Sequence, residues 1–223
     1  MNDRWRPRPA DRHELDEGTN ASPVRELGLG AAIAALRAGH VVAIPTDTVY
    51  GLAVDPTRAG ATDALFALKA RPAWLDLPVL VGSIDQAEAL AGPDGLSSTA
   101  RQLARLFWPG ALTMVVPRRR DLDWALGAHP DTIGLRLPDH TVARTLCAEV
   151  GALATTSANV HGEAPCTDAG SVQGAFGSTM VVVDSGRCAG APSTVVSLVD
   201  DVPQCLREGA LPWADVWAAV GVD

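Results

Sequence analysis

The sequence predicts an α/β fold, a single domain with a twisted, mixed β-sheet flanked by helices. Short apolar runs alternate along the chain with segments whose apolar residues recur at helical spacing. No repeat and no abrupt change of composition divides the chain, and its 223 residues, 47% of them hydrophobic, suffice for one large core. We place the domain at residues 23–223. Residues 1–22 are rich in charge, proline and glycine, so we expect a disordered tail there.

The predicted helices begin and end at recognisable residues. Ser22-Pro23 has the pattern of an N-cap followed by proline at the first helical position, and Gly39 follows the last apolar residue of that segment. Ser83 and Gln86 have the spacing of a capping box, and Asp139 is a candidate N-cap. The predicted helices span 23–38, 62–69, 83–90, 99–107, 139–150 and 213–220.

The predicted strands are short and apolar. The run at 41–45 is apolar throughout, which is typical of a strand inside a sheet. The predicted strands span 41–45, 78–82, 111–116, 132–137, 152–156, 180–184, 194–198 and 204–207. We expect surface loops at 118–130 and 160–168. Polar residues follow several strands directly, which is where α/β folds place their sites.

Charge and composition exclude several classes of protein. The formal net charge is −8, whereas a nucleic-acid-binding protein normally carries a basic face. The basic run 118–120 is therefore interpreted as a solvated patch. No apolar run approaches the roughly 18 residues of a membrane span, and the N-terminus lacks the apolar core of an export signal. We expect a cytoplasmic protein with no membrane contact. No cluster of His, Cys, Asp or Glu has the spacing of metal ligands.

The single lysine is the most informative residue of the chain. The sequence holds 17 arginines but only Lys69, two positions before Arg71. Ammonium and guanidinium groups do different work, so a lone lysine among arginines suggests a place where arginine cannot serve. Lys69 and Arg71 are then a paired clamp for an anion. The alternative, a solvated helix end that complements the helix dipole, is equally compatible with the spacing.

Other polar clusters accompany this pair. They are Thr46 with Thr48, Thr113 after Trp108-Pro109-Gly110, Ser157-Ala158-Asn159, and Ser193 with its neighbours. Hydroxyls, a carboxamide and two cations suit an anionic ligand with a small polar partner. No histidine or carboxylate pair is arranged for acid–base work, so Ser157 is a poor candidate for a nucleophile. Ser157 and Asn159 form an Asx-type turn in the alternative interpretation.

The ordered motifs of the chain resemble those of the YrdC/Sua5 family, the L-threonylcarbamoyladenylate synthases, in their short YrdC-like form. The resemblance covers about residues 24–207. Its motifs, in chain order, are Pro45-Thr46-Asp47-Thr48-Val49-Tyr50-Gly51-Leu52, Lys69-Ala70-Arg71-Pro72, Phe107-Trp108-Pro109-Gly110-Ala111-Leu112-Thr113, Arg136-Leu137-Pro138, Thr156-Ser157-Ala158-Asn159, Ser193-Thr194-Val195-Val196 and Leu206-Arg207.

The resemblance implies a nucleotidyltransferase that joins L-threonine, bicarbonate and ATP into threonylcarbamoyl-AMP and pyrophosphate, for the t6A37 modification of tRNA. It implies Lys69 and Arg71 as catalytic residues. The implied ATP-binding residues are Lys69, Arg71, Thr113, Arg136, Ser157, Asn159 and Arg207. The implied threonine-binding residues are Thr46, Thr48, Thr155 and Ser193. Mg²⁺ is expected to accompany ATP, with no ligands from the protein identified.

The resemblance also sets expectations about partners. In the short form, separate proteins transfer the threonylcarbamoyl group, so direct contact with tRNA is expected to be weak or indirect. Leu80 stands where the family often has histidine, which implies a differently built threonine pocket. Two alternatives remain: an RNA-binding module that shares the fold, and a paralogue that adenylates another carbamoyl substrate.

Overall fold

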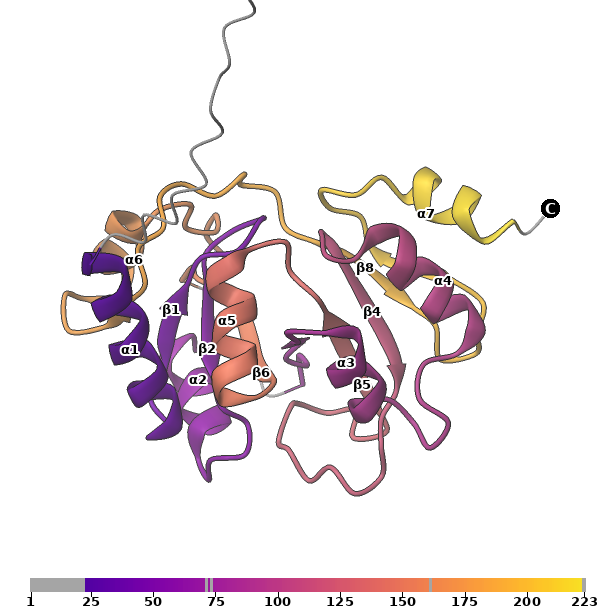
Figure 1. Cartoon of the computed structure of the whole chain (residues 1–223), viewed down its shortest axis with the longest axis horizontal. Helices are drawn as coiled ribbons and strands as arrows, with labels where there is room; N and C mark the ends of the chain where they lie inside the picture. The colour runs from indigo at the N-terminus through magenta and orange to yellow at the C-terminus, as the bar shows by residue number, and fades with distance from the viewer. Residues whose placement is uncertain (1–22, 71, 73, 161, 222–223) are drawn as a thin grey trace, which may run out of the picture.

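A computed structural model describes residues 23–70, 72, 74–160 and 162–221, with side chains from Gly28 onward. The predicted tail, Ser22 and Arg71 lie outside these residues. Within them, one 9-stranded mixed sheet has the order β7-β1-β2-β6-β3-β5-β4-β8-β9, and helices flank it (Figure 1). The predicted fold class is therefore confirmed. No helix in the described part of the chain is both long and apolar enough to cross a membrane.

The strands agree with the predicted runs, with one addition. They are β1 (Val42–Ile44), β2 (Gly51–Val54), β3 (Val79–Leu80), β4 (Leu112–Pro117), β5 (Thr132–Arg136), β6 (Leu153–Ser157), β7 (Val181–Val182), β8 (Thr194–Ser197) and β9 (Gln204–Arg207). The sequence did not predict β2, which pairs antiparallel with both β1 and β6. β1 is fully buried, as expected, but it lies second from the sheet edge, next to β7.

The helices also follow the prediction closely. They are α1 (Pro23–Arg37), α2 (Ala61–Leu68), α3 (Ile84–Leu90), α4 (Ser98–Phe107), α5 (Thr141–Val150), α6 (Ala169–Phe176) and α7 (Trp213–Val220). α6, which Asp168 caps, was not predicted. The cap of α5 was wrongly assigned: its N-cap is His140, and Asp139 instead faces Arg144 at 3.9 Å.

The proposed capping box of α3 is half formed. Ser83 Oγ accepts a hydrogen bond from the backbone amide of Gln86, as predicted. The Gln86 side chain, however, accepts from the backbone amide of Gly82 at 2.7 Å rather than from Ser83. It also donates to the carbonyl of Cys147, so it joins α3 to α5.

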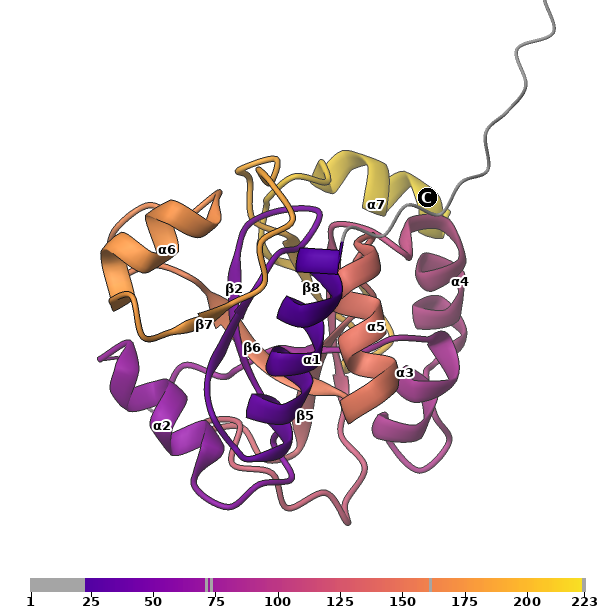
Figure 2. The same cartoon turned by 60° about the vertical axis from the view of Figure 1, so that its left-hand side comes forward.

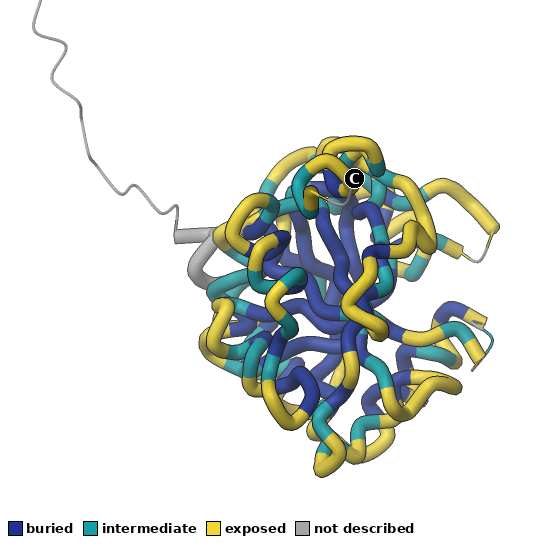
Figure 3. The backbone as a smooth tube through the Cα atoms, turned by 90° about the vertical axis from the view of Figure 1, so that its right-hand side faces the viewer, coloured by how far each residue is buried: buried dark blue, intermediate teal, exposed yellow. Residues whose placement is uncertain are grey.

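Two apolar clusters hold the sheet between its helices. α1 and α5 lie side by side over one face, where Leu36 and Leu146 pack with Ile44 and Leu153 (Figure 2). The larger cluster includes residues of α2, α4, α6 and α7. The strands inside the sheet are accordingly buried, the edge strand β9 is exposed, and the connecting loops are mostly exposed (Figure 3). Each buried strand can then project alternate side chains into two different cores.

The loop before β5 departs from the prediction at Arg118. This residue was assigned to a solvated basic patch, but it is only 6% exposed. Its Nη2 donates to the carbonyls of Leu122 and Trp124, so the guanidinium fastens the loop from inside. Burial lowers the pKa of Arg118. Only the neighbouring arginines of this run can contribute to a solvated surface.

Candidate active site

Most of the predicted site residues line one pocket of about 210 Å³. The loop between β1 and β2, the end of β6, and the segment before β8 surround it, although these segments are far apart in the sequence. The predicted residues in its wall are Thr46, Thr48, Thr113, Arg136, Thr155, Ser157, Ser193 and Arg207. Lys69 and Asn159 lie behind Ser157 rather than in the wall. Arg71 lies outside the described residues.

The loop after β1 is held by the hydroxyl of Thr46. Thr46 Oγ1 lies 2.6 Å from the carbonyl oxygen of Val49 and 2.9 Å from Thr48 Oγ1. The backbone amides of Thr48 and Val49 also donate to it, at 3.1 and 3.2 Å. This pattern is an ST-type turn, in which a side-chain oxygen replaces a backbone acceptor. It presents Thr48 toward the pocket.

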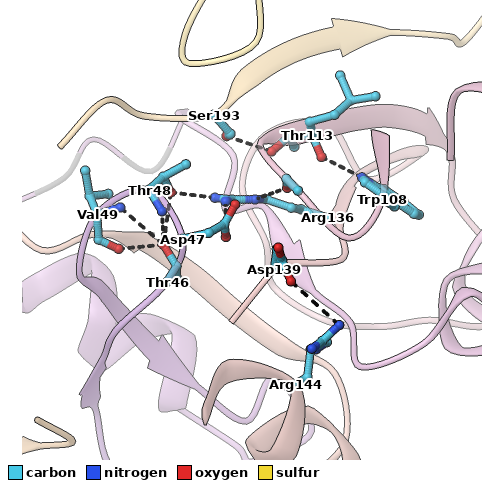
Figure 4. A network of polar contacts seen from close by, with 12 residues as sticks. Thr46, Asp47, Thr48, Val49, Trp108, Thr113, Arg136, Asp139, Arg144 and Ser193 are labelled. Carbon is cyan, nitrogen blue, oxygen red and sulfur yellow. Dashed lines mark hydrogen bonds and ion pairs between the residues drawn. The ribbon is translucent and has the colours of Figure 1, made fainter. Parts of the chain in front are cut away.

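Arg136, the last residue of β5, points its guanidinium at this loop from the side (Figure 4). Its Nη2 forms an ion pair with Asp47 Oδ1 at 2.6 Å, and its Nη1 donates to Thr48 Oγ1 at 2.8 Å. Its Nε donates to the carbonyl oxygen of Gly110 at 3.0 Å. The residue is only 6% exposed, and burial lowers its pKa while Asp47 opposes the shift. A buried guanidinium in this setting holds its neighbours in a fixed geometry.

The opposite wall of the pocket comes from β4, β8 and β9. Thr113 Oγ1 and Ser193 Oγ lie 2.9 Å apart, because β4 and β8 pair in parallel with Thr113 beside Val195. Arg207 on β9 donates from Nη2 to the carbonyl oxygen of Ser193 at 2.7 Å. Arg207 is exposed, yet partial desolvation still lowers its pKa. This wall therefore presents hydroxyls and one accessible cation.

Lys69 occupies the C-cap of α2 and is 4% exposed. Its ammonium donates to the carbonyl oxygen of Ser157 at 2.6 Å, to Asn159 Oδ1 at 2.9 Å and to Thr156 Oγ1 at 3.2 Å. The solvated helix end considered from the sequence does not describe this buried position. The lysine charge is placed against the turn that follows β6.

The carboxamide of Asn159 is fully engaged within the chain. Its Oδ1 accepts from Lys69 and from Ser157 Oγ, the latter at 2.7 Å. Its Nδ2 donates to the carbonyl oxygens of Val160 and Glu163, at 3.0 and 2.8 Å. A primary amide has two donors and one doubly accepting oxygen, so every position is used. This geometry matches the turn interpretation, in which Asn159 shapes the wall while Ser157 faces the pocket.

A second pocket of about 240 Å³ adjoins the first. The two share Pro78, Thr113, Ser193 and Arg207 as a common wall. Apolar side chains line much of the second pocket, among them Leu77, Leu126, Ile133 and Val195. Asp76 and His129 lie at one end of it, with Oδ2 and Nδ1 2.6 Å apart. Apolar walls with a few polar groups at the ends are typical of ligand pockets.

Some residues of the first pocket were not predicted from the sequence. Pro78, Pro165 and Pro192 shape its wall. Leu80, which the family resemblance associated with the threonine pocket, also lines it. Asp47 lies within the Pro45–Leu52 motif, but the sequence predicted no function for it. In the structure it forms the ion pair with Arg136. Asp47 stands between Thr46 and Thr48, both predicted to be site residues, and this position could have indicated its role from the sequence. The proline contributions carry no comparable signal, since they depend on how the strands pack.

Comparisons with known proteins agree with this arrangement. The family model Sua5_yciO_yrdC, described as telomere recombination, matches residues 34–209. A putative threonylcarbamoyl-AMP synthase of Mycobacterium leprae is 41% identical over 202 residues, which cover 89% of this chain and 90% of that protein. Threonylcarbamoyl-AMP synthase of Bacillus subtilis is 37% identical over 197 residues. These cover 86% of this chain but 56% of that protein, so the chain spans little more than half of its length.

Solved structures of related proteins have the same fold as this chain. The crystal structure of Pyrococcus abyssi Sua5 complexed with L-threonine has a TM-score of 0.81 and 33% sequence identity. The match covers 86% of this chain and 57% of that one. Escherichia coli YciO has a TM-score of 0.75 at 21% identity, which shows a common fold alone.

Proposed function

The chain belongs to the Sua5/YciO/YrdC family, and on that premise we propose that it is a threonylcarbamoyl-AMP synthase. It joins L-threonine, bicarbonate and ATP into threonylcarbamoyl-AMP and pyrophosphate. One observation carries the proposal: family motifs that lie far apart in the sequence converge on a single polar pocket. The product supplies the t6A37 modification of tRNA, and we assign the transfer to tRNA to separate proteins.

We place L-threonine at the end of the pocket formed by Thr48, Thr155 and Ser193. All three residues line the pocket of about 210 Å³, and their hydroxyl groups suit a polar amino acid. Buried polar groups discriminate strongly, because a substrate that lacks a matching hydroxyl leaves them without a partner. Leu80 adds an apolar surface that can contact the threonine methyl group. This site gives a physical basis for preferring threonine to valine.

We place the nucleotide along the Arg207 side of the pocket and in the adjoining second pocket. In the adenylation step, a carbamate oxygen bonds to the α-phosphorus of ATP while the bond to the bridging oxygen breaks and pyrophosphate leaves. Such a step needs positioning and positive charge where the phosphate oxygens gain charge. Arg207 and Lys69 supply cations among the described residues, and Arg71 is the third candidate.

The residues that the structure describes do not offer a binding site for Mg²⁺ of their own. No group of three or more His, Cys, Asp or Glu side chains that could hold a metal ion occurs within the described part of the chain. Asp47, in the loop after β1, is already paired with Arg136. Magnesium commonly binds through substrate phosphates with few protein ligands. We therefore expect Mg²⁺ to enter as part of the ATP complex.

The test is pyrophosphate release by the purified protein with ATP, Mg²⁺, L-threonine and bicarbonate. Release that requires all four supports the proposal. Release that requires a different acceptor instead of threonine would identify the paralogue alternative. No release with any amino acid, together with RNA binding that falls steeply with added salt, would identify the RNA-binding alternative. The burial of Arg118 already reduces the basic surface available to RNA.

A further inference from the structure

The second pocket has a largely apolar floor that includes a glycine. Val115 on β4 pairs with Gly134 on β5, and both residues line the pocket. A glycine inside a strand often marks a place where a ligand approaches the backbone closely. A Cβ at position 134 would lie 3.6 Å from Pro78 and Thr113, which also line the pocket, so the missing side chain leaves room there. The floor therefore suits a planar ring such as a nucleobase.

The loop between β4 and β5 forms one wall of this pocket and is held from inside. Arg118 Nη2 donates to the carbonyl oxygens of Leu122 and Trp124, at 2.5 and 2.9 Å. The amide of Leu126 donates to the same Trp124 carbonyl at 3.0 Å, and the Leu126 carbonyl accepts from the amide of Leu77 at 2.7 Å. These bonds place Leu126, which is 4% exposed, in the pocket wall.

The same loop brings His129 against Asp76 at the end of the pocket. Asp76 Oδ1 accepts from the backbone amide of His129 at 3.2 Å, and Asp76 Oδ2 lies 2.6 Å from His129 Nδ1. Gly127 permits this approach: its φ is +145°, and a Cβ there would lie 2.3 Å from Asp76 Oδ1. Two bonds from one carboxylate therefore orient the imidazole ring, which lines the pocket.

The pairing decides which nitrogen of His129 carries the proton. An ionised carboxylate can only accept, so Nδ1 must donate to Asp76 Oδ2. In the neutral ring, Nε2 then has a lone pair and no proton. The His129 side chain is 68% exposed, so a ligand can reach it. Toward that ligand, the ring presents a hydrogen-bond acceptor.

Adenine is complementary to an acceptor at this position. Its 6-amino group donates, whereas guanine and hypoxanthine have at the same place a carbonyl oxygen that only accepts. Two acceptors that face each other both lack a partner, and this lowers the affinity. Arg207 and Ser193, which this pocket shares with the first one, supply donors for the phosphates of the same nucleotide.

We propose that Asp76 and His129 recognise the nucleobase and make the site selective for adenine. His129 accepts from the 6-amino group through Nε2, and Asp76 is a positioning residue that holds the ring in the required tautomer. The inference rests on the proposed function, which puts a nucleotide in the second pocket, and it names the residues that select ATP. Neither residue belongs to the motifs that carry the family resemblance.

The test is calorimetric titration with three nucleoside triphosphates and Mg²⁺ at about pH 8.5, where histidine is neutral. They are ATP, ITP with a carbonyl in place of the 6-amino group, and purine riboside triphosphate with only hydrogen there. Wild-type protein should bind ATP about tenfold more tightly than the purine analogue, the effect of one hydrogen bond. His129→Asn keeps a donor for Asp76 but lacks the acceptor, so it should bind both equally. His129→Gln places an amide oxygen near the position of Nε2 and should recover part of the preference.

Asp76→Asn separates control of the tautomer from a structural role. The asparagine oxygen can still accept from the amide of His129, while its nitrogen donates to Nδ1 and so moves the ring proton to Nε2. The ring then donates, so the preference for ATP over ITP should fall about tenfold or reverse. Asp123→Asn, at an exposed carboxylate of the same loop outside both pockets, makes the same change of charge and should leave the preference unaltered.

An equal preference for ATP in the wild type, His129→Asn and Asp76→Asn would overturn the inference. So would a loss of affinity in His129→Asn that is the same for ATP and the purine analogue, because the ring would then contribute packing alone. If Asp76→Asn does not fold, the variants at the exposed His129 still decide. Selective ATP binding through this pair without threonine-dependent pyrophosphate release would support the inference and refute the proposed function.

Discussion

Two arginines line the same pocket in contrasting surroundings. Arg136, near the middle of the sheet on β5, is 6% exposed and is bonded to a carboxylate, a hydroxyl and a carbonyl. Arg207, on the edge strand β9, is exposed and donates to the carbonyl of Ser193. The comparison teaches that position in the sheet decides whether a cation organises the protein or remains available to a ligand.

The largest effect should follow from breaking the buried pair. Arg136→Met leaves the Asp47 carboxylate without its cation, which should lower the free energy of unfolding by about 3–5 kcal/mol. Arg207→Ala should lower it by less than about 1 kcal/mol, because the side chain is exposed. Urea titration of both variants measures the difference. Equal losses of stability would erase the distinction between the two arginines.

Lys69 is a second buried cation, and its substitution tests whether a lysine behind the pocket wall matters as much as Arg136. Lys69→Arg keeps the charge but introduces a broader group into a site that is 4% exposed. A displacement of about 1 Å at the Ser157–Asn159 turn can lower the rate on the order of a hundredfold. Threonine-dependent pyrophosphate release measures this loss. Arg105→Lys, at an exposed position of α4, is the control. Near-normal activity in Lys69→Arg would show that the ammonium group is not required.

Arg207 should show its effect in binding rather than in stability. Loss of a charge-assisted hydrogen bond costs about 1.5 kcal/mol or more, so Arg207→Ala should raise the KM for ATP about tenfold. Arg207→Lys should recover part of the affinity, because it retains the charge. Calorimetric titration of ATP gives an independent measurement. An unchanged ATP affinity would remove Arg207 from the nucleotide site.

The smallest effect concerns Tyr50, a fully buried neutral group near the same loop. Its hydroxyl donates to the carbonyl of Gly186 at 3.0 Å and accepts from the amide of Ser185, and burial raises its pKa to about 12. Tyr50→Phe should lower the free energy of unfolding by about 1 kcal/mol without changing the KM for ATP.

The pH dependence follows from the sign of that shift. The unfolded chain releases the phenol proton near pH 10, whereas the folded chain keeps it to about 12. The contribution of Tyr50 to stability is therefore full below about pH 10 and is lost as pH rises toward 12. Stability curves of Tyr50→Phe should be flatter over that range. Parallel curves for both proteins would contradict the shift.

Local patterns explain most of what could be predicted from the sequence. Helix caps and apolar periodicity act over a few residues, so α1, α3 and α7 lie within a few residues of the expected positions. β2 was missed because it is four residues long and follows the motif loop directly. α6 was missed because glycine at 170 and 174 weakens its helical signal.

The sequence predicted which polar residues form the site, but not which of their side chains bond to one another. The motifs placed Thr48, Arg136 and Ser157 in one site, and the pocket brings them together. The pairing of Asp47 with Arg136 depends on strands that meet only in the folded sheet. The burial of Arg118 is likewise a tertiary effect, since the side chain bends back to its own loop. Neither can be derived from spacing along the chain.

The bond between Asp47 and Arg136 joins positions 89 residues apart, and this has a consequence for the order of folding. Loop closure over so long a segment is entropically costly, so such contacts form after the local ones. A nascent chain that has not yet formed β5 carries the Thr46–Thr48 turn without its guanidinium. Affinity for the amino acid should therefore emerge only when β5 joins the sheet, late in the maturation of the protein.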